Sequence, residues 1–247
     1  LELVSIVFMI IGSLPFVVYL HFIHGEKNSL FNDDQIKLFF ILLLVSIFLM
    51  IIWLYFILEN DLALSARFAF FNITSILTGT GYTSADYSVW GGFASIIMIF
   101  IMFIGGCAGS TTGGIKIFRL QVLFRGAKTQ IKKLTQPHAV ILMKFNGKTV
   151  TENTYSSIMG FFFMYIFLFL LSSVSLSFFD LDFITSLSAA ASAISNVGPG
   201  LGSIVGPTEN YSSLHYGAKW ILSFTMLIGR LEIFTVIILF SRTYWKS

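Results

Sequence analysis

Charged residues are scarce in this sequence. Of its 247 residues only 11% are Asp, Glu, Lys or Arg, whereas 56% are hydrophobic and the mean hydropathy is +0.86. A soluble domain carries about a quarter charged residues, so this balance excludes an ordinary soluble globular protein. It predicts a polytopic membrane protein.

Cysteine is nearly absent, because Cys107 is the only one. A disulfide within the chain and a metal site built from several cysteines are therefore both excluded. A signal peptide is also missing, since Leu1 opens an apolar run that has neither a basic flank nor a small-residue cleavage site. We therefore expect a fragment or a truncated chain.

Long uncharged runs account for much of the hydrophobicity. Three of them cover residues 38–58, 87–115 and 153–179, and each is long enough for the ~20 residues that a spanning helix needs. Residues 3–23 and 217–241 predict two further helices. The fold class is therefore expected to be all-α and polytopic.

Positive charge is concentrated in one segment. Eight of the 15 Lys and Arg residues fall within 115–152, which the positive-inside rule assigns to the cytoplasm. Alternation of the spans then puts 24–37 and the tail after Arg242 on the same side, with 59–92 and 178–216 outside. Acidic residues dominate the outer segments and would raise the local cation concentration, although acidic loops are often simply solvated. They are Glu59, Asp61, Asp86, Asp180, Asp182 and Glu209, against a single basic residue, Arg67.

The two halves of the chain repeat one plan. Residues 38–58 align with 155–175, and the stretch 77–81 aligns with 194–198. Each half reads as a spanning helix, a short half-apolar helix, a glycine-containing stretch and a second span. The short helices cannot cross a bilayer, and they predict re-entrant pore helices followed by irregular backbone. They cover residues 67–77 and 184–194.

The glycine stretches predict an ion filter. A dehydrated monovalent cation needs several oxygen ligands, and the carbonyls of an extended strand can supply a ring of them when several copies surround one axis. Gly81 and Gly198 would allow the required backbone angles, and Thr78 and Ser195 could add hydroxyl oxygens. A glycine-rich packing loop would explain either stretch alone, but its recurrence after both pore helices favours a filter. The candidate residues are Thr78, Gly79, Thr80, Gly81, Ser195, Asn196, Val197 and Gly198.

A second glycine-rich segment lies inside the uncharged run 87–115. It lacks the spacing of a phosphate-binding Walker loop, since Lys116 follows Ile115 and precedes Ile117. Glycines in a span cost about 1 kcal/mol each against Ala, so the segment should break the helix, either as a functional loop or as a packing kink. Its candidate residues are Gly105, Gly106, Gly109, Ser110, Thr111, Thr112, Gly113 and Gly114.

A third trace of the repeat and one charge complete the pattern. Residues 9–13 match 102–106 and 226–230, so the first helix looks like the last span of an earlier copy. Arg230 lies within a predicted span, where a charge costs ~3 kcal/mol or more. It should face a carboxylate, the bundle interior or a water path, and Glu232 is two positions on, so the two do not face each other. A purely structural ion pair is the alternative role.

Four quoted stretches carry a family resemblance: FFNITSILTGTGYTSADY, FIGGCAGSTTGGIKIFRL, SNVGPGLG and LIGRLEIFTVIILF. Together they resemble the Trk/Ktr/HKT potassium transporters, most closely the TrkH membrane subunits, and the likeness covers nearly the whole chain. It implies four units of outer helix, pore helix, filter and inner helix around a pseudo-fourfold pore. Residues 1–37 would be the inner helix of the second unit and its linker, 38–152 the third unit, and 153–247 the fourth.

The resemblance also implies roles and partners. The chain would belong to a potassium uptake transporter of the bacterial cytoplasmic (inner) membrane, with potassium as the transported ion and no organic cofactor. Residues 105–114 would form an intramembrane gating loop, and Arg230 an electrostatic barrier beneath the filter. A homodimer and a cytosolic ring of nucleotide-binding RCK subunits are implied, docking on 119–148 and the tail from Arg242. The fourth filter, SNVGP, departs from a Thr-Val-Gly-Tyr pattern, which suggests lower selectivity.

Other functions carry less support from the residues. An intramembrane enzyme would need paired catalytic groups in the spans, where only Arg230 and Glu232 qualify, and nothing points to nucleic acid. A truncated, non-conducting or regulatory remnant of such a transporter stays an alternative, as does a sodium-coupled Ktr-type cation transporter. The coupling ion is left open.

Overall fold

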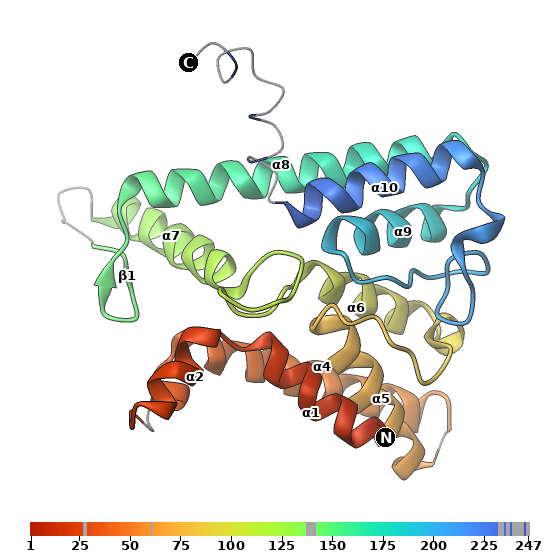
Figure 1. The fold of residues 1–247 in the computed structure, drawn as a ribbon, viewed down its shortest axis with the longest axis horizontal. Helices are drawn as coiled ribbons and strands as arrows, with labels where there is room; N and C mark the ends of the chain where they lie inside the picture. The colour runs from red at the N-terminus through yellow and green to blue at the C-terminus, as the bar shows by residue number, and fades with distance from the viewer. Residues whose placement is uncertain are drawn as a thin grey trace.

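The chain folds into two similar helical halves in a computed structural model that describes residues 1–26, 29–59, 61–136, 142–231, 235, 238 and 245. Figure 1 shows α4, α5 and α6 in one half and α8, α9 and α10 in the other. The first half has α1 (Glu2–Ser13), α2 (Phe16–Ile23), α3 (Ser29–Asn32), α4 (Asp34–Phe56), α5 (Leu62–Leu77), the 3-10 helix η1 (Tyr87–Trp90) and α6 (Gly92–Phe103). It is followed by α7 (Ile117–Thr135), β1 (Lys144–Phe145), β2 (Lys148–Thr149), α8 (Glu152–Ser177), α9 (Phe183–Ser195), the 3-10 helix η2 (Tyr211–Ser213) and α10 (Tyr216–Arg230).

Two helices of the described chain, α4 and α8, are each long and apolar enough to cross a membrane. Each begins at a capping side chain that satisfies free amides of the first turn. The Asp33 carboxylate accepts from the amide of Gln35 at 2.7 Å, and the Thr151 hydroxyl accepts from the amide of Thr154 at 3.3 Å. This confirms the spanning helices predicted over 38–58 and 155–175.

The two short helices also form as predicted, although α5 begins earlier, at Leu62. Asp61 caps α5 and Asp182 caps α9. Helix α5 packs against α4, and α9 packs against both α8 and α10. Small residues on α9 are fully buried, because Ala189 and Ala190 are both 0% exposed, so neighbouring backbones approach this pore helix closely.

Two predicted spans need correction, and a third is described only in part. Residues 3–23 form two helices, α1 and α2, bent by 93°, because Pro15 in the break cannot donate an amide hydrogen to continue α1. In the run 87–115 the only α-helix is α6, of 12 residues, which follows the 3-10 helix η1, and the glycine-rich segment after α6 forms no helix. In the predicted span 217–241, α10 ends at Arg230, and because most of 232–241 lies outside the described residues, the second part of this span stays a prediction. Glu232 and Arg242 lie outside the described residues.

The basic segment folds into elements that no local pattern had predicted. Helix α7 packs against α4 and α8, and β1 pairs antiparallel with β2. The hairpin turn is Asn146-Gly147, with φ of 44° and 76°, a pair that suits a tight turn because both residues tolerate positive φ. Figure 1 places α2, α7 and the hairpin at one end of the molecule and the loops around η1 and η2 at the other.

Candidate functional site

The glycine stretch at residues 78–81, which we call the third stretch after its expected unit, turns all its amides back onto the helix α5. The Thr78 amide donates to Thr74 at 3.0 Å, the Gly79 amide to Ile76 at 2.9 Å, and the Thr80 amide to Ser75 at 2.9 Å. Within the described part of the chain, no donor is recorded for the carbonyl oxygens of 78–81. Because the backbone of this stretch forms hydrogen bonds only through its amides, its carbonyl oxygens are free to face a cation.

The backbone of this stretch is not the extended strand that we predicted. Thr78 is still in the right-handed helical region, with φ −82° and ψ −6°. Gly79 and Gly81 then take positive φ of 66° and 78°, which costs glycine little. The amide bonds to the end of α5 account for the difference, because they keep the chain coiled against the helix.

The glycine stretch at residues 195–198, which we call the fourth stretch after its expected unit, has a similar hydrogen-bonding pattern with different side chains. The Val197 amide donates to the Ser192 carbonyl at 3.0 Å, and the Gly198 amide donates to the Ser192 hydroxyl at 3.0 Å. Asn196 is left-handed, with φ 56°, and its Nδ2 donates to the Met226 carbonyl at 3.1 Å. The side chain of Asn196 therefore ties this stretch to α10.

Two details bear on the oxygens expected from this stretch. The Ser195 hydroxyl is buried and pairs with the Tyr165 hydroxyl of α8 at 2.7 Å, so it points toward the outer helix. The Gly198 carbonyl accepts from the Tyr211 hydroxyl at 2.6 Å. Burial raises the pKa of the Tyr211 phenol, so this hydroxyl in the outer loop keeps its proton at neutral pH.

The two glycine stretches lie against each other. A Cβ atom at Gly81 would come within 2.1 Å of the Val197 carbonyl oxygen, a distance that no side chain tolerates. A Cβ atom at Gly198 would lie 4.0 Å from the Gly81 Cα. Gly81 is thus required both for its positive φ and for this close approach, whereas Gly198 is required for its φ of 122°.

The glycine-rich segment 105–114, which we call the intramembrane loop, packs beneath both stretches. A Cβ atom at Gly113 would lie 2.0 Å from the Ser195 carbonyl oxygen, and one at Gly79 would lie 3.6 Å from the Gly113 amide. A cavity of about 360 Å³ is lined by Thr78, Thr80 and Thr111, among others. Residues of the third stretch and of the loop therefore face one shared space.

The loop is anchored by backbone bonds to both of its flanks. The Gly105 amide donates to the Ile115 carbonyl at 2.9 Å, which closes the loop at its base. The Cys107 amide donates to the Ser13 carbonyl at 3.0 Å, so the end of α1 holds the loop from one side. Such pairing compensates for the helix that the glycines interrupt.

Arg230 approaches the loop from α10. Its Nη1 donates to the Thr111 carbonyl at 3.2 Å. The structure thus brings together the loop and the one charged candidate residue of the predicted pathway. Gly109, by contrast, has open space around its Cβ position.

Lys116 is a loop contact that the sequence analysis missed, because we counted it only among the cytoplasmic positive charges. Its ammonium donates to the Thr112 hydroxyl at 2.9 Å and to the Ser110 carbonyl at 3.3 Å, and it also contacts the Thr112 carbonyl. Four loop oxygens surround this one cation when the Ser110 hydroxyl at 3.5 Å is included. The Lys116 ammonium therefore stabilises the loop from the residues that follow the loop in the chain. The Gly-Gly-Ile-Lys order, which puts a cation two positions after the last glycine, was the available signal.

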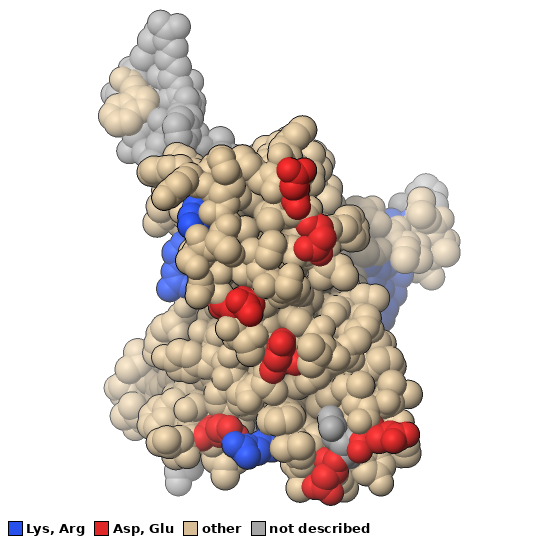
Figure 2. Space-filling model, turned by 90° about the vertical axis from the view of Figure 1, so that its right-hand side faces the viewer, with Lys and Arg blue, Asp and Glu red and all other residues tan. Residues whose placement is uncertain are grey.

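The end of the molecule that is expected to face outward, which we call the outer end, is rich in acidic side chains. Figure 2 shows this end, where acidic residues outnumber basic ones on the visible face. Arg67 pairs with Glu2 at 2.7 Å, and Lys219, at the outer start of α10, donates to the Ser212 carbonyl at 2.6 Å. Among the described residues, no three His, Cys, Asp or Glu side chains gather as metal ligands, so the oxygens on offer come from the backbone.

Comparison with known proteins decides the family. The family model described as "TrkH: Cation transport protein" matches residues 1–247. The chain belongs to this cation transport family. Its members are multi-pass proteins of the cytoplasmic membrane, with pore units like those of potassium channels, and the family is one of transporters and not a class of enzymes.

Individual relatives agree with the family model. The chain is 39% identical over 241 residues to the Trk system potassium uptake protein TrkI of Halomonas elongata, covering 97% of this chain and 49% of that protein. It is 31% identical over 244 residues to TrkH of Salmonella typhimurium, covering 98% of this chain and 50% of that one. The chain thus spans about half the length of the curated relatives it matches.

A solved structure shares the fold. The crystal structure of the potassium transporter TrkH from Vibrio parahaemolyticus superposes with a TM-score of 0.87 at 30% identity. The superposition covers 99% of this chain and 52% of that chain. The TrkH-family fold inferred from the four quoted stretches is therefore confirmed.

Proposed function

We propose that this chain supplies the third and fourth pore units, residues 38–152 and 153–247, of a potassium uptake transporter, with 1–37 as the inner helix and linker of the second unit. The observation that carries the proposal is the pairing of the two glycine stretches. Their amides bond back to α5 and α9, and Gly81 lies against the Val197 carbonyl. One further observation, the potassium uptake named in the relatives' descriptions, supports potassium as the ion.

In this proposal the cation loses its water against carbonyls of residues 78–81 and 195–198. Preorganised carbonyl dipoles replace the hydration shell without reorganisation at each passage. The carbonyl oxygens of the fourth stretch are not equivalent as cation ligands, because the Gly198 carbonyl already accepts a hydrogen bond from the Tyr211 hydroxyl. We therefore expect weaker discrimination between potassium and sodium than in a fourfold-symmetric channel.

The loop and Arg230 form the obstacle on the cytoplasmic side of the filter. The loop backbone lies directly under both stretches, with Gly113 against Ser195, and it blocks the path sterically. The Arg230 guanidinium at Thr111 adds electrostatic repulsion toward an arriving cation. A cytosolic RCK-type ring binding a transporter homodimer would control whether this obstacle opens.

The test is potassium uptake by the full-length transporter in cells that lack their own potassium uptake systems. Gly81→Ala should abolish uptake because the new methyl group meets the Val197 carbonyl, and Gly198→Ala should reduce it through its φ. Gly92→Ala is the matched control, since a Cβ there meets nothing within 4 Å. Wild-type uptake in both filter variants, at normal membrane abundance, would refute the filter. Loss of transport by the wild type itself would favour the non-conducting alternative.

A further inference from the structure

Gln35 is a buried polar side chain that reaches the middle of the intramembrane loop. It lies in the first turn of α4 and is 8% exposed. Its Oε1 accepts a hydrogen bond from the Ala108 amide at 2.8 Å. Moving the loop away would leave the buried Gln35 acceptor and the amide of the half-buried Ala108 unpaired, which costs more than the bond itself contributes. Gln35 therefore favours the loop position seen here.

This contact differs in kind from the other loop anchors. Those at Gly12, Ser13 and Phe16 are made by backbone atoms next to the α1–α2 bend. Lys116 belongs to the segment that leaves the loop. Within the described residues, Gln35 is the one side chain from outside the loop with a recorded hydrogen bond to residues 105–109, so its position can change independently of the loop's own chain.

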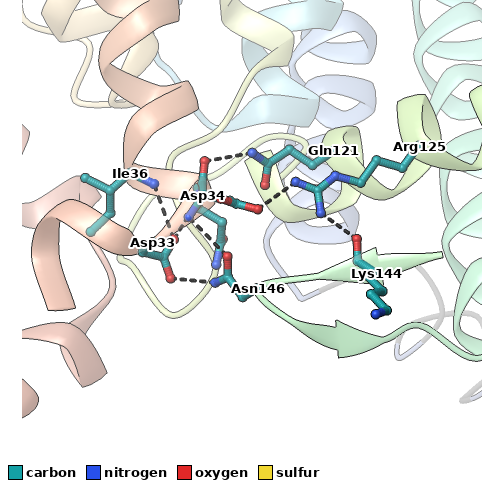
Figure 3. Close-up of polar contacts among 8 residues, drawn as sticks. Asp33, Asp34, Ile36, Gln121, Arg125, Lys144 and Asn146 are labelled. Atoms are coloured by element: carbon teal, nitrogen blue, oxygen red, sulfur yellow. Dashed lines mark hydrogen bonds and ion pairs between the residues drawn. The ribbon is translucent and has the colours of Figure 1, made fainter. Parts of the chain in front are cut away.

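The start of α4 is itself held on the cytoplasmic side by a group of polar residues shown in Figure 3. We call it the cap cluster, and it comprises Asp33, Asp34, Gln121, Arg125 and Asn146. Arg125 Nη2 lies 2.6 Å from Asp34 Oδ2, and Gln121 Nε2 donates to the Asp34 carbonyl at 2.7 Å. Asn146 Nδ2 donates to Asp33 Oδ2 at 3.0 Å. These bonds join α7 and the β1–β2 hairpin to the residues directly before Gln35.

We propose that Gln35 is a positioning residue that holds the intramembrane loop closed, and that the cap cluster sets where Gln35 stands. A displacement of α7 or the hairpin on the cytoplasmic side would then move the start of α4, and with it Gln35 and the loop. It would also move the loop through Lys116, which directly precedes α7 in the chain. The loop is thus held at Ala108 by Gln35 and at Ser110 and Thr112 by Lys116. The inference rests on the proposed function, in which the loop closes the cation path.

Cys107 supplies a direct reporter of loop position. It is the only cysteine of the sequence, it precedes Ala108, and it is 0% exposed. In the full-length transporter, with any cysteine outside residues 1–247 replaced by Ser, the labelling rate of Cys107 by a small methanethiosulfonate reagent measures how often the loop opens. Cation flux into liposomes is measured on the same preparations.

Gln35→Leu removes the acceptor at nearly constant volume. Labelling of Cys107 should rise about fivefold, the population shift that corresponds to losing one hydrogen bond, and passive flux should rise with it. Gln35→Glu keeps an acceptor oxygen at a helix N-terminus, where negative charge is favoured, and should restore slow labelling. The matched control is Gln130→Leu on the exposed part of α7, which should label like the wild type.

The cap cluster is tested by Arg125→Ala combined with Asn146→Ala, neither of which touches the loop. Labelling should again rise, and adding Gln35→Leu should increase it less than additively in free energy, because the changes share one path. Wild-type labelling in a monodisperse Gln35→Leu protein would overturn the role of Gln35. Wild-type labelling in the Arg125–Asn146 double variant would overturn the role of the cluster. If neither the wild type nor any variant moved cations, the proposed function would be refuted. The Cys107 labelling rates would still test whether Gln35 holds the loop.

Discussion

The Nη1 atom of Arg230 donates a hydrogen bond to the carbonyl oxygen of Thr111 across 3.2 Å. This bond joins the last described turn of α10 to the centre of the intramembrane loop, 119 positions away in the sequence. The guanidinium and the loop therefore act at one place on the proposed path, and a change at either should alter the same barrier.

Removing either part of this barrier should increase leak. A cation ~4 Å from the guanidinium meets a repulsion of ~4 kcal/mol at an effective dielectric of ~20, and solvent around the exposed side chain lowers that figure. Arg230→Ala, and separately a deletion within 109–113, should raise passive flux of the full-length transporter in liposomes without the cytosolic partner. The combined variant should show less than the additive effect in free energy.

Reduced flux in both single variants, with folding and dimer formation intact, would contradict this account. Arg230 and the loop would then build the path instead of blocking it. Arg67→Ala serves as the control, because Arg67 lies at the outer end and pairs with Glu2.

Lys116→Met should also raise passive flux, since it removes the ammonium that bonds Ser110 and Thr112 while retaining most of the side-chain volume. Bonds to a charged donor contribute ~1.5–3 kcal/mol each when buried, less here because the site is only partly buried. Lys128→Met is the matched control in the same basic segment. Equal flux in the two variants would show that Lys116 does not hold the loop and only contributes positive charge that orients the chain in the membrane.

Tyr165→Phe should lower the preference for potassium over sodium. It removes the hydroxyl of α8 that pairs with the Ser195 hydroxyl at the end of α9. Loss of this buried hydrogen bond should destabilise the observed position of the fourth stretch by about 1 kcal/mol. Tyr155→Phe is the control on the same helix, because no hydrogen bond of its hydroxyl is recorded among the described residues. The ratio of rubidium to sodium uptake measures the effect, and an unchanged ratio in Tyr165→Phe would count against a selective role for this stretch.

Charge reversal at Lys128, Lys132 and Lys133 should weaken docking of a cytosolic RCK-type ring. Lys128 and Lys132 are exposed on α7, and Lys133 approaches Glu152 only at 4.0 Å, so their charge is available to a partner. A pulldown with purified ring subunits measures the loss, with Lys37→Glu as the control on α4. Undiminished binding would mean that these lysines only orient the chain in the membrane.

The sequence predicted the elements that depend on hydrophobic length and repetition. Spans α4 and α8 and pore helices α5 and α9 follow from uncharged runs and from two aligned halves, and glycine density located the break after α6. The 93° bend at Pro15 was missed, because hydropathy is the same on both sides of it. The contact of Gln35 with Ala108 joins residues 73 positions apart, and no local pattern encodes such a pairing. Lys116 was assigned to topology because a count of charge says nothing about where a side chain turns.

The central claim is that a cation sits between the two glycine stretches. The most direct measurement is a structure of the full-length transporter in thallium or rubidium salt, with anomalous scattering used to locate the ion. Density should appear within coordination distance of carbonyl oxygens from both 78–81 and 195–198, on the outer side of the loop at Gly113, and it should vanish in Gly81→Ala. Ordered cation density elsewhere in the pore, with none at these carbonyls, would contradict the account.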